Sequence, residues 1–245
     1  LYGTQSANGV IVITTKRGKT GAARWDLFTA QGVSVDPYDY PGQYYNLGKT
    51  PAGATIDCVS WREVQGLCTV QQRYTKNLLE DKATTPFGTG NRQQYGAQVS
   101  GGSDQLRYFV SGTWENEIGV LKMPDSELDS LYRIRNTTSI PRDQRLPNQL
   151  TRTGIRGNFN VAMTPQADLA ISSGVNVMSN LLPQTGDNLQ GVVGSALFGT
   201  ANPAAPQQWG FAPPRQGFSK SVTRSQDQFT NSVNANWRPV DWIQT

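Results

Sequence analysis

The stretch "QQYGAQVSGGSDQLRYFVSGTWEN" (93–116) contains two runs of alternating apolar and polar residues, one on each side of the turn "GSDQ". After the turn, Leu106, Val110 and Trp114 fall on one face of an extended chain. The odd-numbered residues between them fall on the opposite face and are mostly polar. Phe109 is the exception on the otherwise polar face. Alternation with a period of two residues indicates a β-strand with one apolar and one polar face. The stretch therefore predicts an antiparallel hairpin.

The same alternation recurs in four further segments of the chain. They are "RWDLFTAQGVS" (24–34), "GIRGNFNVAMT" (154–164), "LAISSGVNVMS" (169–179) and "QFTNSVNANWR" (228–238). On the apolar face of the resulting sheet we expect Val110, Phe159 and Val175, because each belongs to an alternating run. On the polar face we expect Arg156, Asn158 and Asn234.

The connections between these segments alternate in length. Short turns join some strands, whereas the segments 35–92, 117–152 and 180–226 are long and rich in Pro and Gly. A short helix is expected only over 72–82. Short turns at one end, long loops at the other and aromatic residues near strand ends are typical of an outer-membrane β-barrel, with its apolar face toward lipid. A soluble β-sandwich, which also alternates, is the alternative. The aromatic residues are Trp25, Tyr95, Trp114, Trp237 and Trp242.

The composition fits polar sheets and long loops. Of the 245 residues 36% are hydrophobic and 16% charged, and the remaining polarity comes largely from uncharged residues and Gly. The net charge is +4, but the basic residues are scattered, so no nucleic-acid partner is expected. No run approaches the roughly 20 apolar residues that a membrane helix needs.

No catalytic or metal site emerges from the sequence. The chain has no histidine, the commonest general base and metal ligand. Asp125, Glu127 and Asp129 are spaced like the start of a calcium loop, but the central Gly and closing Glu are missing. We interpret them as a solvated charge run. We expect no cofactor and no enzymatic activity.

Cys58 and Cys68 are the two cysteines, and both lie in the turn-rich segment "IDCVSWREVQGLC". Two thiols make a poor zinc site, because four ligands are the norm. We expect a disulfide within a long extracellular loop, which implies an oxidising compartment. Two unrelated free thiols are the alternative.

The opening "LYGTQSANGVIVITTKRG" (1–18) places four β-branched residues together at 10–13, so neither face of this strand is polar. It resembles the end of the plug domain in TonB-dependent outer-membrane transporters of the SusC/RagA type. The match rests on the blocks 1–3, 7–10 and 13–18, and its centre, residues 4–6, departs from the pattern. The segments "QVSGGSDQLRYFVSGTWENEIGVL" and "IRGNFNVAMTPQADLAISSGVNV" resemble barrel strands of the same family. The plug motif comprises Gly3, Asn8, Gly9, Lys16 and Gly18.

The resemblance implies an all-β fold and two regions. Residues 1–21 would be the C-terminal end of the plug and its hinge, and 22–245 the first part of a transmembrane β-barrel. That part would hold about six of the roughly 22 antiparallel strands of the barrel. The implied function is import of an oligosaccharide or peptide across the cell outer membrane of a Gram-negative bacterium. The implied partners are outer-membrane lipid, the TonB complex, which energises import, and a SusD-like surface lipoprotein.

Rival functions remain open at this point. A siderophore or metal-chelate receptor would have the same architecture, and a surface adhesion protein or a soluble carbohydrate-binding β protein would use the long loops differently. Loop aromatics could stack on sugar rings, but such residues more often pin a long loop by packing. The aromatics in question are Tyr38, Tyr40, Tyr44, Tyr45, Trp61, Trp209 and Phe211.

Overall fold

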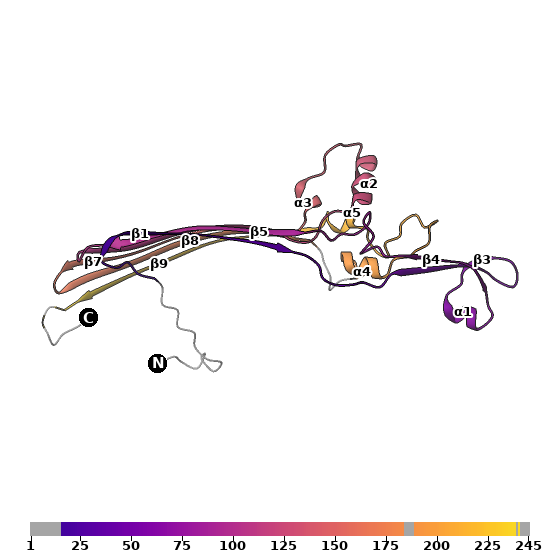
Figure 1. Cartoon of the computed structure of the whole chain (residues 1–245), viewed down its shortest axis with the longest axis horizontal. Helices are drawn as coiled ribbons and strands as arrows, with labels where there is room; N and C mark the ends of the chain where they lie inside the picture. The colour runs from indigo at the N-terminus through magenta and orange to yellow at the C-terminus, as the bar shows by residue number, and fades with distance from the viewer. Residues whose placement is uncertain (1–15, 184–188, 239, 241–245) are drawn as a thin grey trace.

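The computed structural model describes residues 16–183, 189–238 and 240. Its main feature is a long six-stranded sheet with the strand order β1-β5-β6-β7-β8-β9 (Figure 1). Every neighbouring pair is antiparallel. All six alternating segments are therefore strands, and most extend further than the alternation predicts. The strands are β1 (Gly21–Ser34), β5 (Gly90–Gly102), β6 (Leu106–Ile118), β7 (Gln149–Thr164), β8 (Ala167–Pro183) and β9 (Ser221–Trp237).

The register of the main sheet separates two chemically different faces. Residues paired across neighbouring strands project to the same side, and successive residues project to opposite sides. One row across the polar face consists of Asp26, Gln98, Ser111, Arg156, Gly174 and Thr230. The adjacent row, on the apolar face, consists of Leu27, Ala97, Gly112, Ile155, Val175 and Phe229.

The expected sidedness agrees with this register. Val110 and Val175 lie in rows of the apolar face, and Arg156, Asn158 and Asn234 lie in rows of the polar face. Trp242, expected near a strand end, lies outside the described residues.

Long connections meet at one end of the main sheet, but they are not the structureless loops that the sequence suggests. The first forms a small sheet of order β3-β2-β4. The helix expected over 72–82 is wrong, because β4 occupies its first half and pairs with β2, so tertiary pairing overrides local propensity. The small sheet consists of β2 (Gln43–Lys49), β3 (Thr55–Asp57) and β4 (Thr69–Lys76).

Among the described residues, five short helices also lie in the long connections, at the same end of the main sheet (Figure 1). No described helix is long and apolar enough to cross a membrane. The helices are α1 (Ser60–Val64), α2 (Asp125–Arg135), α3 (Arg142–Arg145), α4 (Val192–Leu197) and α5 (Pro214–Gly217).

The hydrophobic core of the described chain lies among these connections, and we call this region the loop core. All three connections contribute to it, so they fold against one another as one unit. Leu78 and Phe218, from the first and third connections, are almost completely buried. The ten buried members are Leu78, Leu79, Leu121, Met123, Leu131, Ile140, Val192, Ala196, Trp209 and Phe218.

Candidate functional site

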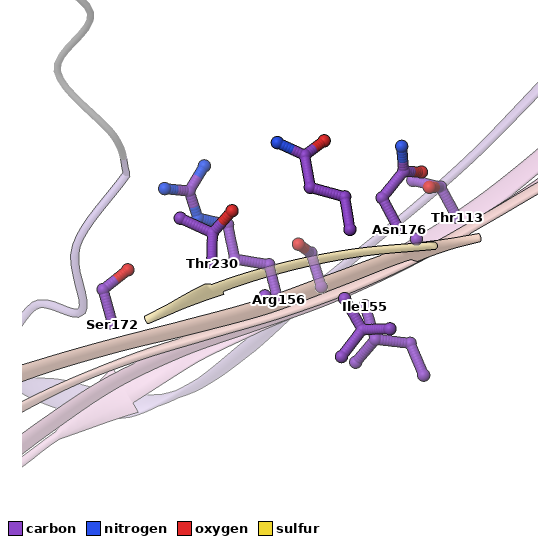
Figure 2. Close-up of a pocket in the computed structure, with 11 residues that line it drawn as sticks. Thr113, Ile155, Arg156, Ser172, Asn176 and Thr230 are labelled. Carbon is purple, nitrogen blue, oxygen red and sulfur yellow. The ribbon is translucent and has the colours of Figure 1, made fainter. Parts of the chain in front are cut away.

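The polar face of the main sheet carries a hollow of about 330 Å³ over β6, β7, β8 and β9. The hollow forms because Gly154 and Gly174 have no side chains to fill the space between their taller neighbours. Figure 2 shows Arg156 and Asn176 on one side of the sheet and Ile155 on the opposite side. The side chains on the polar side of the hollow belong to Ser111, Thr113, Arg156, Ser172, Asn176, Gln228 and Thr230.

Arg156 is the charged group of this hollow, and hydroxyl and amide side chains surround it. Within the described residues, no ion pair or hydrogen bond engages its guanidinium group. A free guanidinium offers a planar fork of donors for a carboxylate or for hydroxyl groups. None of the lining side chains is a carboxylate, a histidine or a cysteine. The hollow therefore presents hydroxyl, amide and guanidinium groups that can form hydrogen bonds with a polar solute.

A buried carboxylate lies on the same face, toward the loop core. Glu115 is almost completely buried on β6. Arg92 on β5 approaches it with Nε at 2.6 Å, and Arg152 on β7 with Nη1 at 3.6 Å. The carboxylate thus links three neighbouring strands, and its contact with Arg92 is a charge-assisted hydrogen bond, a class stronger than neutral hydrogen bonds.

Residues 16–20, which precede β1, lie on the polar face, and we call this segment the strap. The buried amide of Asn158 donates from Nδ2 to the Lys16 carbonyl oxygen over 2.6 Å. Gly18 lies so close to the β6 backbone that an added Cβ would come within 2.3 Å of the Tyr108 nitrogen. Two residues of the expected plug motif, Lys16 and Gly18, are therefore in contact with the polar face. The other three, Gly3, Asn8 and Gly9, lie outside the described residues.

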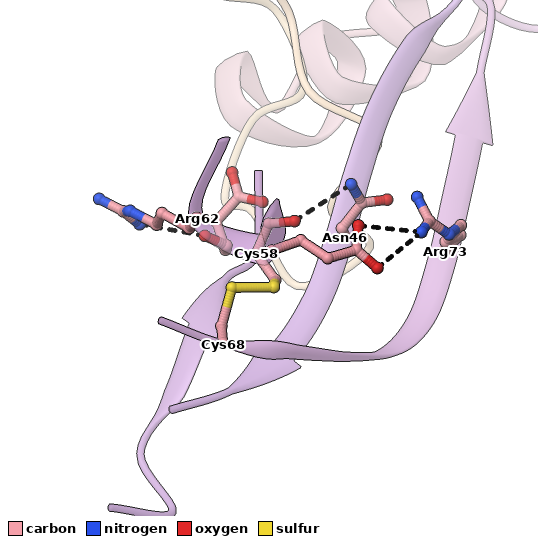
Figure 3. The surroundings of a disulfide bond; sticks show 7 residues. Asn46, Cys58, Arg62, Cys68 and Arg73 are labelled. Atoms are coloured by element: carbon pink, nitrogen blue, oxygen red, sulfur yellow. Dashed lines mark hydrogen bonds and ion pairs between the residues drawn. A yellow bond between two sulfur atoms is a disulfide. The ribbon is translucent and has the colours of Figure 1, made fainter. Parts of the chain in front are cut away.

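Cys58 and Cys68 form a disulfide with their Cα atoms 5.8 Å apart (Figure 3). The bond closes the segment that contains α1 and fixes it to the small sheet. Gly48 on β2 lies against the bond, because an added Cβ there would come within 2.5 Å of the Cys58 Cβ. Asn46 donates from Nδ2 to the Cys58 carbonyl oxygen over 3.2 Å. The ion pair between Arg73 and Glu63, at 3.1 Å, crosses from β4 to α1.

Three of the seven loop aromatics pack inside the connections. Trp209 is 4% exposed and belongs to the loop core. Tyr40 stacks on Phe87 with ring centroids 5.4 Å apart, and Tyr45 stacks on Tyr74 at 6.0 Å. Burial, together with a hydrogen bond to the Asp36 carboxylate, raises the pKa of Tyr40 from 10.0 to about 12. These three rings therefore stabilise the connections.

The other four loop aromatics, Tyr38, Tyr44, Trp61 and Phe211, are exposed. Phe211 meets Phe198 edge to face, with centroids 5.5 Å apart. The backbone at Phe211 is anchored, because the buried Ser195 hydroxyl accepts hydrogen bonds from the Phe211 and Ala212 amides. Sequence patterns did not identify Phe198 or Ser195, since their contacts arise from a fold that has no periodicity.

The acidic run at 125–129 is not a fully solvated charge run. It belongs to α2, and Glu127 is buried against Arg215, with 2.7 Å between the carboxylate and the guanidinium. The partner lies 88 residues away in the chain, so sequence spacing could not reveal it. In the part of the chain that the structure describes, no group of three or more His, Cys, Asp or Glu side chains could hold a metal ion.

Comparisons with known proteins add one relative. No family model matches the chain. A segment of 126 residues is 30% identical to "TonB-dependent receptor P3" of Formosa agariphila. The match covers 49% of this chain and 11% of that protein, so the chain spans only a small part of the curated relative it matches. The similarity, taken with the antiparallel sheet, supports a relationship to the TonB-dependent receptors.

Proposed function

We propose that this chain is part of a TonB-dependent receptor of the SusC/RagA type in the cell outer membrane of a Gram-negative bacterium. In this proposal the main sheet is a portion of the wall of a β-barrel. Its apolar face contacts lipid, and its polar face lines the lumen. Residues 22–245 then belong to the barrel, and residues 1–21 are the end of the plug and its hinge.

The observation that carries the proposal is a band of exposed apolar side chains on one face of the main sheet. Leu106 and Trp114 lie on that face, eight residue steps apart, or about 27 Å along a strand. Strand tilt shortens this height, which then approximates the apolar band of about 25 Å in outer-membrane barrels. Next to the Trp114 row, the same face changes to a wholly polar row. That row consists of Gln31, Gln93, Asn116, Thr151, Ser179 and Ser225.

A soluble sandwich accounts less well for the same side chains. Leu27 is 78% exposed and Phe229 is 70% exposed. A sandwich buries such residues between two sheets, whereas the buried core of this chain lies in the connections. Contiguous exposed apolar surface of this extent marks a face that contacts protein or membrane.

The transported ligand in this proposal is an oligosaccharide or a peptide, and its import is energised through TonB. The similarity to "TonB-dependent receptor P3" supports the receptor class. The hollow around Arg156 supports passage of a polar solute, because it offers hydroxyl, amide and guanidinium groups without a catalytic set. A SusD-like lipoprotein that captures the ligand at the surface completes the proposal.

Quenching of tryptophan fluorescence by brominated lipid tests the lipid-facing band. The full-length protein would carry Trp25 or Trp114 as the only tryptophan and would be reconstituted in vesicles. Both lie on the apolar face, so we expect strong quenching of each. A variant that retains only Trp209, which is buried in the loop core, is the matched control and should be quenched little. Equal quenching at all three positions would refute the proposed wall.

A further inference from the structure

The strap crosses neighbouring strands of the main sheet. It leaves β1 at Gly21, whose φ of +131° is a backbone conformation that glycine tolerates. It then passes over β5 and β6 and reaches Asn158 on β7. Three interstrand spacings amount to about 14 Å. The five residue steps from Gly21 to Lys16 reach about 17 Å at full extension, so the strap is nearly taut.

Contacts along the strap hold it close to the sheet. Gly18 is buried against the Tyr108 backbone, where the side chain of any other residue would collide. Phe109, the apolar exception on the polar face, is buried in the same region and lines the pocket that the strap borders. Lys16 donates from Nζ to Gln98 Oε1 over 3.3 Å. The apolar residue that interrupts the alternation of β6 thus lies where the strap crosses.

The far end of the strap is held by one buried amide. Asn158 is 4% exposed, and its Nδ2 donates to the Lys16 carbonyl oxygen. Its Oδ1 accepts a hydrogen bond of 2.6 Å from the Ser172 hydroxyl on β8. Both ends of the amide are therefore engaged, and Ser172 fixes the orientation in which the donor meets the strap.

We infer that Asn158 is the positioning residue that keeps the strap stretched across the polar face, with Ser172 orienting its amide. This contact sets the point, above β7, from which the chain before Lys16 departs. If the proposed function holds, on which this step rests, that point is where the plug joins the wall. The anchor itself is a property of residues on β7 and β8 and can be tested without any transport.

The rate of trypsin cleavage measures directly how firmly the strap is docked on the sheet. The strap contains three possible cleavage sites with exposed side chains, Lys16, Arg17 and Lys19. Proteolysis requires a segment to open locally, so a docked strap resists cleavage. In the full-length protein in detergent, Asn158→Leu keeps the branched shape of the side chain and removes the donor. We expect cleavage in the strap to accelerate about tenfold, the order expected for loss of a buried hydrogen bond.

Two further variants and an internal reference complete the test. Ser172→Ala should accelerate strap cleavage less than Asn158→Leu, because the donor remains but is no longer oriented. Asn160→Leu is the matched control, since Asn160 lies on the same face of the same strand and makes no hydrogen bond to the strap. Cleavage at the exposed Lys82 in the first connection reports general loosening and should not change.

The inference is overturned if Asn158→Leu and Asn160→Leu give the same rate of strap cleavage, or if cleavage at Lys82 rises in parallel. Failure of the proposed function would look different. The full-length protein would then show no lipid contact or no uptake, while strap cleavage would still depend on Asn158.

Discussion

The main sheet and the loop core differ in the exposure of their apolar side chains. In the loop core, short helices and irregular segments bury Leu78, Trp209 and Phe218 against one another. In the main sheet, the most regular part of the chain, residues such as Leu27 and Phe229 remain exposed. Hydrogen bonding between strands holds the sheet together without burial of its apolar face. Regular structure and buried core are therefore separate in this molecule, and their responses to mutation should differ.

The largest expected contrast is between two leucines. Leu78→Ala removes a side chain that is 0% exposed in the loop core and should cost about 2–5 kcal/mol of the unfolding free energy. Leu27→Ala on the exposed apolar face creates no cavity and should cost far less. Denaturant unfolding of both variants measures the difference. Equal losses of unfolding free energy would show that the two regions do not differ in how they are stabilised.

A charge placed on one face or the other of the main sheet should reveal which face contacts lipid. In a lipid environment Val175→Arg should cost about 2–4 kcal/mol, because the guanidinium would face hydrocarbon. Asn234→Arg lies on the polar face and should cost little. Unfolding titrations in lipid vesicles compare the two variants. A smaller loss for Val175→Arg than for Asn234→Arg would reverse the proposed orientation.

Removing the disulfide tests how the small sheet is stabilised. The double change Cys58→Ser and Cys68→Ser opens a bond between residues ten positions apart and should cost about 2–3 kcal/mol by the chain-entropy account. We expect the loss to be local, with faster hydrogen exchange in β2 and β4 and unchanged exchange in β7 and β8. Uniform acceleration across both regions would contradict their separation. In the unmodified protein, mass spectrometry of non-reduced digests should find the two cysteines joined.

The smallest effect is expected at Tyr40, at the margin of the loop core. Burial first, and then the Asp36 carboxylate, raises the pKa of this phenol to about 12. A raised pKa means that folding favours the neutral phenol, so the stabilisation is present below pH 10 and is lost as the pH rises toward 12. Ultraviolet titration should show Asp36→Asn lowering the pKa of Tyr40. An unchanged pKa in that variant would exclude Asp36 as a cause.

The sequence predicts the main sheet well and the loop core poorly, for a physical reason. Alternation in β6 and β7 is a local property, and the tight turns after β5 and β7 indicate two of the strand pairings directly. Contacts in the loop core join distant segments, as Glu127 and Arg215 do, and leave no periodic trace. The helix expected over 72–82 failed because β4 gains its conformation from pairing with β2.

The candidate site likewise has features that the sequence predicts and features that it does not. Alternation places Arg156 and Asn158 on the polar face, but it cannot reveal that Gly154 and Gly174 open a hollow beside the guanidinium. Nor can it reveal that Asn158 meets Lys16, which is 142 residues away. The disulfide between the two cysteines, unlike these contacts, was predictable, because their spacing of ten residues in a turn-rich segment already suggested the bond.

The tautness of the strap has a mechanical consequence. A slack tether of the same composition would absorb a small displacement by straightening, and the sheet would feel no force. The strap has only about 3 Å of length in reserve, the difference between its reach and the spacings that it crosses. A pull on the chain before Lys16 along the strap's direction is therefore transmitted through the backbone to Gly21 and β1 almost at once, and the hydrogen bond from Asn158 links the same pull to β7. The strap contacts the sheet at Gly18 as well as at Lys16, so it behaves as a short link that loads several strands together.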